Sequence, residues 1–358
     1  MATQPAVAQA GAQRIFAEKI AEIKHLRALA WNGQTLYASR GYSLFAAEPE
    51  RSFSWREVGQ FSPAPWRHIT ARNRLSFRLF RDGFHALAAH PYGNLIAAVP
   101  GAIVTLTAGE KKFHVTYRIT RGTRPLHITA VPDGRVYWGE YFDNPERDEV
   151  HIYVSRDSGA TWQAEHTFPV GSIRHIHNIV YDHWAHCLWV FTGDYGGECR
   201  IIRASLDFSS MEEVLAGSQQ ARAVAAIANE DGLYFASDTP LEQNHIFHLD
   251  RSGNVSRLCD ISSSSIYACR NNSGMFFTTM VEPSEVNRSC EVQLVGSGDG
   301  ETWTKVVSWR KDRWPMKFFQ YGNACLPDGN NETNLLAAST IAVEGADLTT
   351  TIWQTSTI

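Results

Sequence analysis

Seven side chains that can exchange protons or bind anions recur along this sequence at intervals of 42 to 58 residues. Arg27 and Tyr321 are separated by 294 residues, so the six steps between the seven positions average 49 residues. Apart from His177, each is followed directly by a small or apolar residue. Imidazole, phenol and guanidinium groups at one recurrent position suit acid–base chemistry on an anionic substrate. The seven residues are Arg27, His85, His127, His177, Arg222, Tyr267 and Tyr321.

Other chemically capable residues follow the same period. Carboxylates come directly after three of the expected second strands, at Glu140, Asp194 and Asp238. The expected connections between units (60–84, 118–126, 168–174 and 309–318) hold thirteen Lys and Arg residues but only two acids, and they include Arg174 and the aromatic Trp314. Guanidinium groups hold carboxylates and flat rings stack on sugars, so these residues are candidate contacts to an acidic glycan.

His175 and His177 are two residues apart, so both imidazoles point to the same side of an extended strand. His177 with His85 and His127 from neighbouring units is an alternative set of ligands for a divalent metal. No local motif enforces such a site, and we expect no cofactor.

A repeated turn identifies the elements that position these side chains. Ser155-Arg-Asp-Ser-Gly-Ala-Thr-Trp162 and Ser297-Gly-Asp-Gly-Glu-Thr-Trp303 share Ser, Asp, Gly, Thr and Trp, and alternating strands flank both segments. The Asp carboxylate can accept backbone N–H bonds while Gly takes the left-handed conformation. The two Trp residues are 141 residues apart, or three units of 47, which is the length of a four-stranded propeller blade.

Seven such units account for nearly the whole chain. We therefore predict an all-β fold: one domain, 1–358, forming a seven-bladed β-propeller of four-stranded antiparallel blades. Turn dipeptides such as Asn32-Gly33, Asp133-Gly134 and Asp328-Gly329 mark the hairpins between first and second strands. The seventh unit lacks a fourth strand, so we expect 12–23 to close the last blade, with 1–11 disordered; an amphipathic helix over 17–25 is the alternative.

Composition excludes several classes of protein. The net charge of −4 argues against binding nucleic acid through bulk charge, and no apolar run is long enough to cross a membrane. No signal peptide is visible at the start, so the compartment stays open: extracellular or periplasmic if a leader has been removed. A monomer is expected.

The Ser-x-Asp-x-Gly-x-Thr-Trp turns resemble the Asp-box (BNR) turns of sialidase-like β-propellers. The Phe/Tyr-Arg-x-Pro motif of sialidases is absent from the first unit, which disfavours sialidase activity itself. The His, Tyr and Arg positions look more like those of propeller polysaccharide lyases and related glycosidases acting on uronate-containing glycans. That resemblance implies β-elimination at a uronic acid of an anionic oligo- or polysaccharide.

In this interpretation each candidate residue has an expected role. His177, or next His127, removes the proton; Tyr267 or Tyr321 protonates the leaving oxygen; Arg222 and Arg174 hold the carboxylate. The expected substrate contacts are Arg27, His85, His175, Glu140, Asp194, Asp238 and Trp314. A pair of the carboxylates acting in hydrolysis, or a non-catalytic propeller that binds glycan or protein, are the alternatives.

Overall fold

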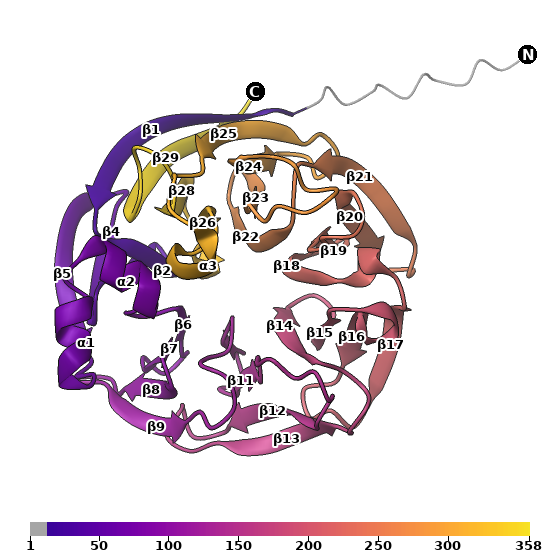
Figure 1. Ribbon diagram of the computed structural model, residues 1–358, viewed down its shortest axis with the longest axis horizontal. Coiled ribbons are helices and arrows are strands. Elements are labelled where there is room, and N and C mark those ends of the chain that lie inside the picture. Colours follow the sequence, from indigo (N-terminus) through magenta and orange to yellow (C-terminus); the bar gives the residue numbers. More distant parts are fainter. Residues whose placement is uncertain (1–12) are drawn as a thin grey trace, which may run out of the picture.

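Seven twisted antiparallel sheets surround a central channel in the computed structural model, which describes residues 13–358 (Figure 1). Each blade has four strands, counted from the channel outward, and one of the seven sheets contains a fifth strand. The predicted seven-bladed propeller is therefore confirmed. Residues 1–11, which are predicted to be disordered, lie outside the described residues. No helix in 13–358 is long and apolar enough to cross a membrane.

The strands follow the chain from blade to blade. Blades 1 to 3 contain β2 (Arg27–Gly33), β3 (Thr35–Arg40), β4 (Ser43–Glu48), β5 (Ser52–Gln60); β6 (Ala86–Ala89), β7 (Leu95–Val99), β8 (Ala102–Leu106), β9 (His114–Arg118); β10 (Thr129–Ala130), β11 (Val136–Gly139), β12 (Val150–Ser155) and β13 (Gln163–Phe168). Blades 4 and 5 contain β14 (His175–Asp182), β15 (Cys187–Gly193), β16 (Arg200–Ala204), β17 (Met211–Ala216); β18 (Ala223–Asn229), β19 (Gly232–Ser237), β20 (Asn244–Asp250) and β21 (Val255–Ile261). Blades 6 and 7 contain β22 (Ser265–Asn271), β23 (Gly274–Thr279), β24 (Glu291–Ser297), β25 (Thr304–Arg310); β26 (Asn323–Cys325), β28 (Leu335–Ile341), β29 (Thr349–Thr357) and β1 (Ile15–Lys24).

The hydrophobic core lies between blades rather than inside any one of them. One cluster joins the facing sides of blades 3 and 4 through Val154, Ile179 and Leu188, and others fill the remaining interfaces around the ring. Both faces of the inner strands are buried, as in β15, where all seven residues are buried. Packing of this kind fixes the blades, and with them the residues at the channel.

The N-terminal strand closes the ring. Strand β1 pairs antiparallel with β29 from Ile15 opposite Thr357 to Lys24 opposite Thr349, and it supplies the outer strand of blade 7. Ile23 and Ala21 pack into the interface between blades 7 and 1. Closure by a strand is confirmed, and the alternative helix over 17–25 is wrong, because pairing covers the free edge of β29.

A second contact joins blade 7 to blade 1 near the channel. The segment around Asp328 and Gly329, expected to be a plain hairpin turn, instead forms β27 (Asp328–Asn331). β27 pairs in parallel with β2, with Ala30 opposite Asp328. The sheet of blade 1 therefore has five strands, and the simple turn predicted there is wrong.

The two Ser–Asp turns have the predicted hydrogen bonds. Asp157 accepts from the backbone N–H of Thr161 at 2.8 Å and from its hydroxyl at 2.6 Å, and Asp299 accepts from the N–H of Thr302 at 2.7 Å. Ser155 Oγ accepts from the N–H of Gly159 at 2.8 Å. These turns join the third and fourth strands of blades 3 and 6, so they fix the outer part of each blade.

Short helices lie in several of the connections between strands. Between β5 and β6 lie α1 (Pro65–Thr70) and α2 (Arg74–Phe80), and α3 (Met316–Phe319) precedes β26. The 3₁₀ helix η1 (Gly196–Glu198) connects β15 to β16 within blade 4, and η2 (Gln219–Ala221) connects blade 4 to blade 5. Helix α2 and α3 lie near one another on the same side of the ring (Figure 1). Together they extend one wall of the channel mouth.

Candidate functional site

A cavity of about 970 Å³ opens at the channel end where the innermost strands begin. Six of the seven periodic residues line it, as expected of residues that share one position in each blade. They are Arg27, His85, His177, Arg222, Tyr267 and Tyr321. The connection through α1 and α2 adds His68, Arg72, Arg74, Phe77 and Arg81 to the wall.

His127 is the exception among the seven. It does not line the cavity; its Nδ1 lies 3.1 Å from a carboxylate oxygen of Asp328 in β27. Its ring meets that of Tyr267 edge-on at 6.2 Å between centroids. His127 therefore lies behind the cavity wall, and the expectation that it shares the mouth with the other six is wrong.

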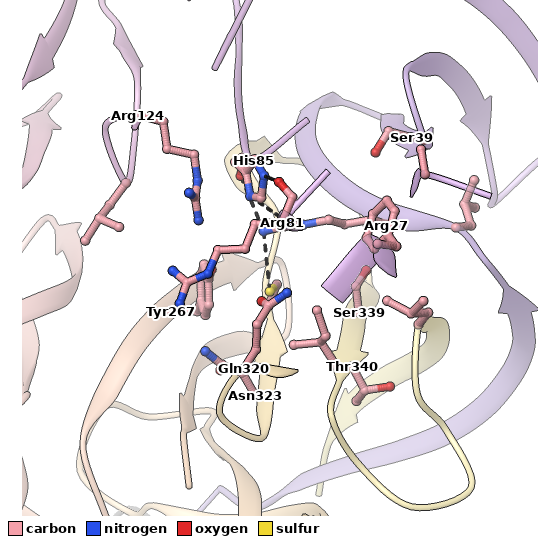
Figure 2. A pocket seen from close by; sticks show the side chains of 18 of the residues that line it. Arg27, Ser39, Arg81, His85, Arg124, Tyr267, Gln320, Asn323, Ser339 and Thr340 are labelled. Carbon is pink, nitrogen blue, oxygen red and sulfur yellow. Dashed lines mark hydrogen bonds between the residues drawn. The ribbon is translucent and has the colours of Figure 1, made fainter. Parts of the chain in front are cut away.

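Three arginines dominate one side of the cavity. Figure 2 shows Arg27, Arg81 and Arg124 arranged around His85 and Tyr267. The guanidinium of Arg27 donates to Nδ1 of His85 at 3.2 Å, and that of Arg124 contacts only the Thr123 hydroxyl, at 3.4 Å. Among residues 13–358, none of the three arginines forms an ion pair with a carboxylate, whereas Arg67, Arg78, Arg121 and Arg174 all do. This side of the cavity therefore carries uncompensated positive charge.

The three neighbouring arginines change the pKa values of groups on this side of the cavity. Burial, reinforced by Arg27 and Arg81, lowers the pKa of Arg124 to about 10. Burial and the neighbouring arginines, Arg124 first, lower the pKa of His85 well below its ordinary value. His85 Nε2 lies 2.6 Å from the carbonyl oxygen of Arg81, which can only accept. The proton of the neutral ring therefore sits on Nε2, and the lone pair of Nδ1 accepts from Arg27.

Local backbone geometry presents Arg81 to the cavity. Arg81 ends α2 in the left-handed conformation, with φ of 50°, and Gly83 follows with φ of +86°. A Cβ at Gly83 would lie 2.9 Å from the carbonyl oxygen of Gly41, so this turn needs glycine. The buried carboxylate of Asp82 fixes the turn, because it accepts from Arg67 at 2.6 Å and from Tyr42 at 2.9 Å.

Arg78 ties the helical connection to the last blade. Its side chain is fully buried and donates to Asp312 at 2.5 Å, to Asp347 at 3.2 Å and to the carbonyl oxygen of Phe319 at 2.9 Å. Strong polar contacts of this kind hold α2 and α3 together over the cavity. The 60–84 connection is therefore an anchored wall of the site.

The other side of the cavity carries carboxylates. Burial raises the pKa of Asp238 to about 7 even though Arg222 Nη2 lies 3.6 Å away, and Glu282 adds to the effect. Glu282 and Tyr141 line the same side, and burial raises the pKa of Tyr141 to about 12. The side of the cavity that carries the three arginines therefore faces a side whose groups can exchange protons.

His175, His177 and Asp194 meet behind this second side. The two Nε2 atoms are 3.0 Å apart, and Asp194 Oδ1 lies 3.2 Å from Nε2 of His177 and 3.5 Å from that of His175. Burial lowers the pKa of His177 to about 4. Burial would raise the pKa of Asp194, but the contacts with His175 and His177 outweigh it and hold that pKa far below its ordinary value. The ring of Tyr141 packs on His175 at 4.4 Å.

Besides His175 and Asp194, three further expected substrate contacts do not line the cavity. Glu140 pairs with Arg121, whose Nε lies 3.1 Å from Oε1, and accepts from the N–H of His151 at 2.9 Å. Arg174 pairs with Asp143 and lies 3.5 Å from Asp194. Trp314 packs edge-on against Phe319. None of the three lines the cavity, so their placement supports positioning rather than contact.

The alternative metal set of His85, His127 and His177 is not brought together. His85 faces Arg27 and the carbonyl of Arg81, and His127 faces Asp328. Among the described residues, the group whose donor atoms lie within 4.8 Å of one another is His175, His177 and Asp194.

Several cavity residues were not identified from the sequence as parts of a site. Arg81 and Arg124 were only two of many arginines in the connections, and Tyr141, Gln320, Asn323 and Cys325 received no role. Cys325 Sγ lies 3.6 Å from Arg27 Nη2, and burial followed by the effect of Cys325 raises the pKa of Tyr267. The local sequence held no usable signal, because Arg124 is nearer than Arg121 in sequence to both Asp133 and Glu140, yet it is Arg121 that pairs with Glu140.

Comparisons with known proteins recover the architecture. No family matches the sequence, and no curated protein does. Among solved structures, a chain of "Crystal Structure of Mitotic Checkpoint Complex" matches with a TM-score of 0.53 and 11% sequence identity, over 99% of this chain and 98% of that chain. At this identity the likeness shows the fold alone: the chain shares a propeller architecture with that structure.

Proposed function

We propose that this protein is a carbohydrate-active enzyme that cleaves an acidic, uronate-containing glycan by β-elimination. The observation that supports the proposal most is the arginine trio, Arg27, Arg81 and Arg124, which faces a cavity without carboxylate partners. Arg27 and Arg124 are half-buried and Arg81 is exposed. Three cations that converge without carboxylate partners repel one another, so their convergence favours an anionic ligand that neutralises them.

A uronic acid fits this arrangement. Its carboxylate would accept from the arginines, and neutralising that charge acidifies the adjacent C5–H. The cavity of about 970 Å³ has room for two or more sugar rings. The opposite side, with Asp238, Glu282 and Tyr141, offers partners for sugar hydroxyls.

The contacts favour His85 over His177 as the base. His177 donates through Nδ1 to the carbonyl oxygen of Ala223 at 3.1 Å, and its Nε2 faces His175 and Asp194. His85 is neutral, and its Nδ1 lone pair accepts from Arg27 at 3.2 Å. That lone pair would become available to the C5 proton when Arg27 turns to the substrate carboxylate. Tyr267 has a raised pKa, so its hydroxyl is protonated and can act as the acid.

The proposed step balances without water or an added reagent. His85 takes the C5 proton, the C4–O bond to the leaving sugar breaks, and a C4=C5 double bond forms. Tyr267 donates its proton to the departing oxygen, and the two residues then exchange protons with solvent to start another cycle. The products are an unsaturated uronate and a new sugar hydroxyl.

The test is direct incubation with uronate-containing oligosaccharides while the far-ultraviolet absorbance of the conjugated double bond is followed. Wild-type protein should generate that absorbance with at least one such glycan. His85→Gln and Tyr267→Phe should each lower kcat by about 10²-fold or more. His151→Gln, on an outer part of blade 3, is the matched control and should retain wild-type kinetics. Full activity in both His85→Gln and Tyr267→Phe would refute the assigned chemistry.

One observation favours hydrolysis as a second candidate. Asp238, with a pKa of about 7, lies beside Glu282 on the same wall, which is the kind of pair that supplies a protonated acid and an ionised base. A hydrolase would release reducing ends without ultraviolet absorbance and would lose activity in Asp238→Asn. The same incubation therefore separates the two reactions.

A further inference from the structure

We propose that His175, His177 and Asp194 form a binding site for one divalent transition-metal ion, with Zn²⁺ the best fit to the donor set. The three residues are all buried, with 5%, 2% and 8% of their surfaces exposed. The proposal concerns this cluster on the wall of the cavity and is independent of the glycan chemistry proposed above.

The hydrogen bonds of the two rings fix where their lone pairs lie. Nδ1 of His175 is 3.0 Å from the carbonyl oxygen of Phe142, and Nδ1 of His177 is 3.1 Å from that of Ala223. A carbonyl oxygen only accepts, so each Nδ1 carries the proton of its neutral ring. Each Nε2 is then an unprotonated lone pair, which is the tautomer that metal-binding histidines adopt when a carbonyl orients them.

Three acceptor atoms consequently converge on one point. Nε2 of His175, Nε2 of His177 and Oδ1 of Asp194 are separated by 3.0, 3.2 and 3.5 Å. In this tautomer no hydrogen atom lies between the three acceptors, so either an added proton or a cation at their centre must relieve their mutual repulsion. Ligands about 2.05 Å from a tetrahedral Zn²⁺ are spaced by about 3.3 Å, which matches the observed separations.

The surroundings hold the carboxylate and keep the local charge negative. Arg222 Nη2 lies 3.3 Å from Oδ1 and Arg174 Nη1 lies 3.5 Å from Oδ2, so both can orient Asp194 from behind. Two arginines face four acids in this region, which leaves a net negative charge for a cation. The four acids are Asp143, Asp194, Asp238 and Glu282.

The fourth coordination position would face the cavity. His177 and Tyr141 both line the cavity, whereas His175 and Asp194 lie behind them. Three protein ligands and one open position are the pattern of sites that take a water molecule or a ligand oxygen, rather than of closed structural sites.

The test is titration of chelator-treated full-length protein with Zn²⁺ alone, with binding measured by calorimetry. We expect one ion per chain, and binding at least tenfold weaker in His175→Ala. His245→Ala is the matched control, because His245 lies 3.4 Å from a single carboxylate, that of Asp260, without a second imidazole. Its Zn²⁺ affinity should equal that of the wild type.

A second measurement keeps the proposal testable if His175→Ala proves unstable. In Co²⁺-loaded His175→Cys, a sulfur-to-cobalt charge-transfer band should appear in the near ultraviolet, and His245→Cys should lack it. Equal Zn²⁺ affinity of the wild type and a folded His175→Ala, or no saturable binding to the wild type, would overturn the proposal. A nitrogen NMR spectrum of the metal-free protein showing one ring fully protonated, together with unchanged spectra after adding Zn²⁺, would do the same.

Discussion

Replacing Arg124 by methionine should stabilise the ligand-free protein while it abolishes binding of an anionic ligand. The side chain reaches the cavity between Arg27 and Arg81, and its single hydrogen-bond partner among the described residues is the Thr123 hydroxyl. Methionine keeps the length and the apolar stem of arginine but removes the charge. An ordinary surface arginine would show neither effect.

The magnitude follows from the shifted titration. The pKa of Arg124 falls from 12.5 to about 10, and at about 1.36 kcal/mol per unit this corresponds to roughly 3 kcal/mol of disfavoured charge. The side chain is only half-buried and borders a cavity that admits water, so screening reduces the penalty to about 1–2 kcal/mol. Arg124→Met should raise the free energy of unfolding by that amount.

Urea denaturation of the wild type and the variant, with and without a saturating uronate, measures both effects. The uronate should stabilise the wild type through binding to the native state and leave Arg124→Met unchanged. Arg121→Met is the matched control in the same connection: it leaves the buried Glu140 without its ion pair and should destabilise by about 3 kcal/mol. Destabilisation of Arg124→Met by more than about 1 kcal/mol would refute an uncompensated charge.

Three further outcomes are expected. Deleting residues 1–24 should lower the melting temperature strongly or prevent folding, because β29 loses its partner strand; an unchanged melting curve would contradict closure by β1. Arg78→Met should destabilise by about 3–5 kcal/mol in urea denaturation, since Asp312 and Asp347 stay buried without their cation; a loss below about 1 kcal/mol would show that α2 is not held by these ion pairs. Asp238 has a pKa of about 7 in the folded protein against about 3.8 unfolded, so it binds a proton in the folded state that it lacks when unfolded, and its contribution to stability falls as pH rises from about 4 to 7. Asp238→Asn should therefore gain stability relative to the wild type across that window, by up to a few kcal/mol, and parallel pH curves of unfolding free energy would contradict the shifted titration.

The blade pattern was predictable because it rests on local chemistry. Turn residues such as Asp157 and Asp299 bond their own backbone within four residues, so their type and spacing survive in the sequence. The closing strand was predictable from a missing partner, since a lone outer edge on β29 had to be covered.

The direction in which each of the seven periodic side chains points was not predictable. Bulges interrupt the innermost strands of several blades, between Ile176 and Asn178 in β14 and between Ser265 and Tyr267 in β22. Each inserts a residue and turns the following side chains, so equal spacing does not give equal orientation. In blade 3 the first strand spans only Thr129–Ala130, which leaves His127 outside the strand and free to face Asp328.

The separation of paired from unpaired arginines also depends on tertiary structure. Arg78 finds its acids 234 and 269 residues away, in segments that approach only when the ring is closed. Arg81, three residues later, finds none within the described chain. No pattern in the local sequence distinguishes the two, so the cationic side of the cavity emerged only with the fold.

The cavity lies across the seam where the last blade meets the first. Arg27 comes from blade 1 and touches Cys325 of blade 7, while β27 adds a direct backbone link between the same two blades. A ligand that contacts both blades would hold them together at the interface that must separate before the propeller unfolds. Bound ligand would then lower the rate of unfolding. The lifetime of the folded propeller would therefore depend on the fraction of the protein that has ligand bound.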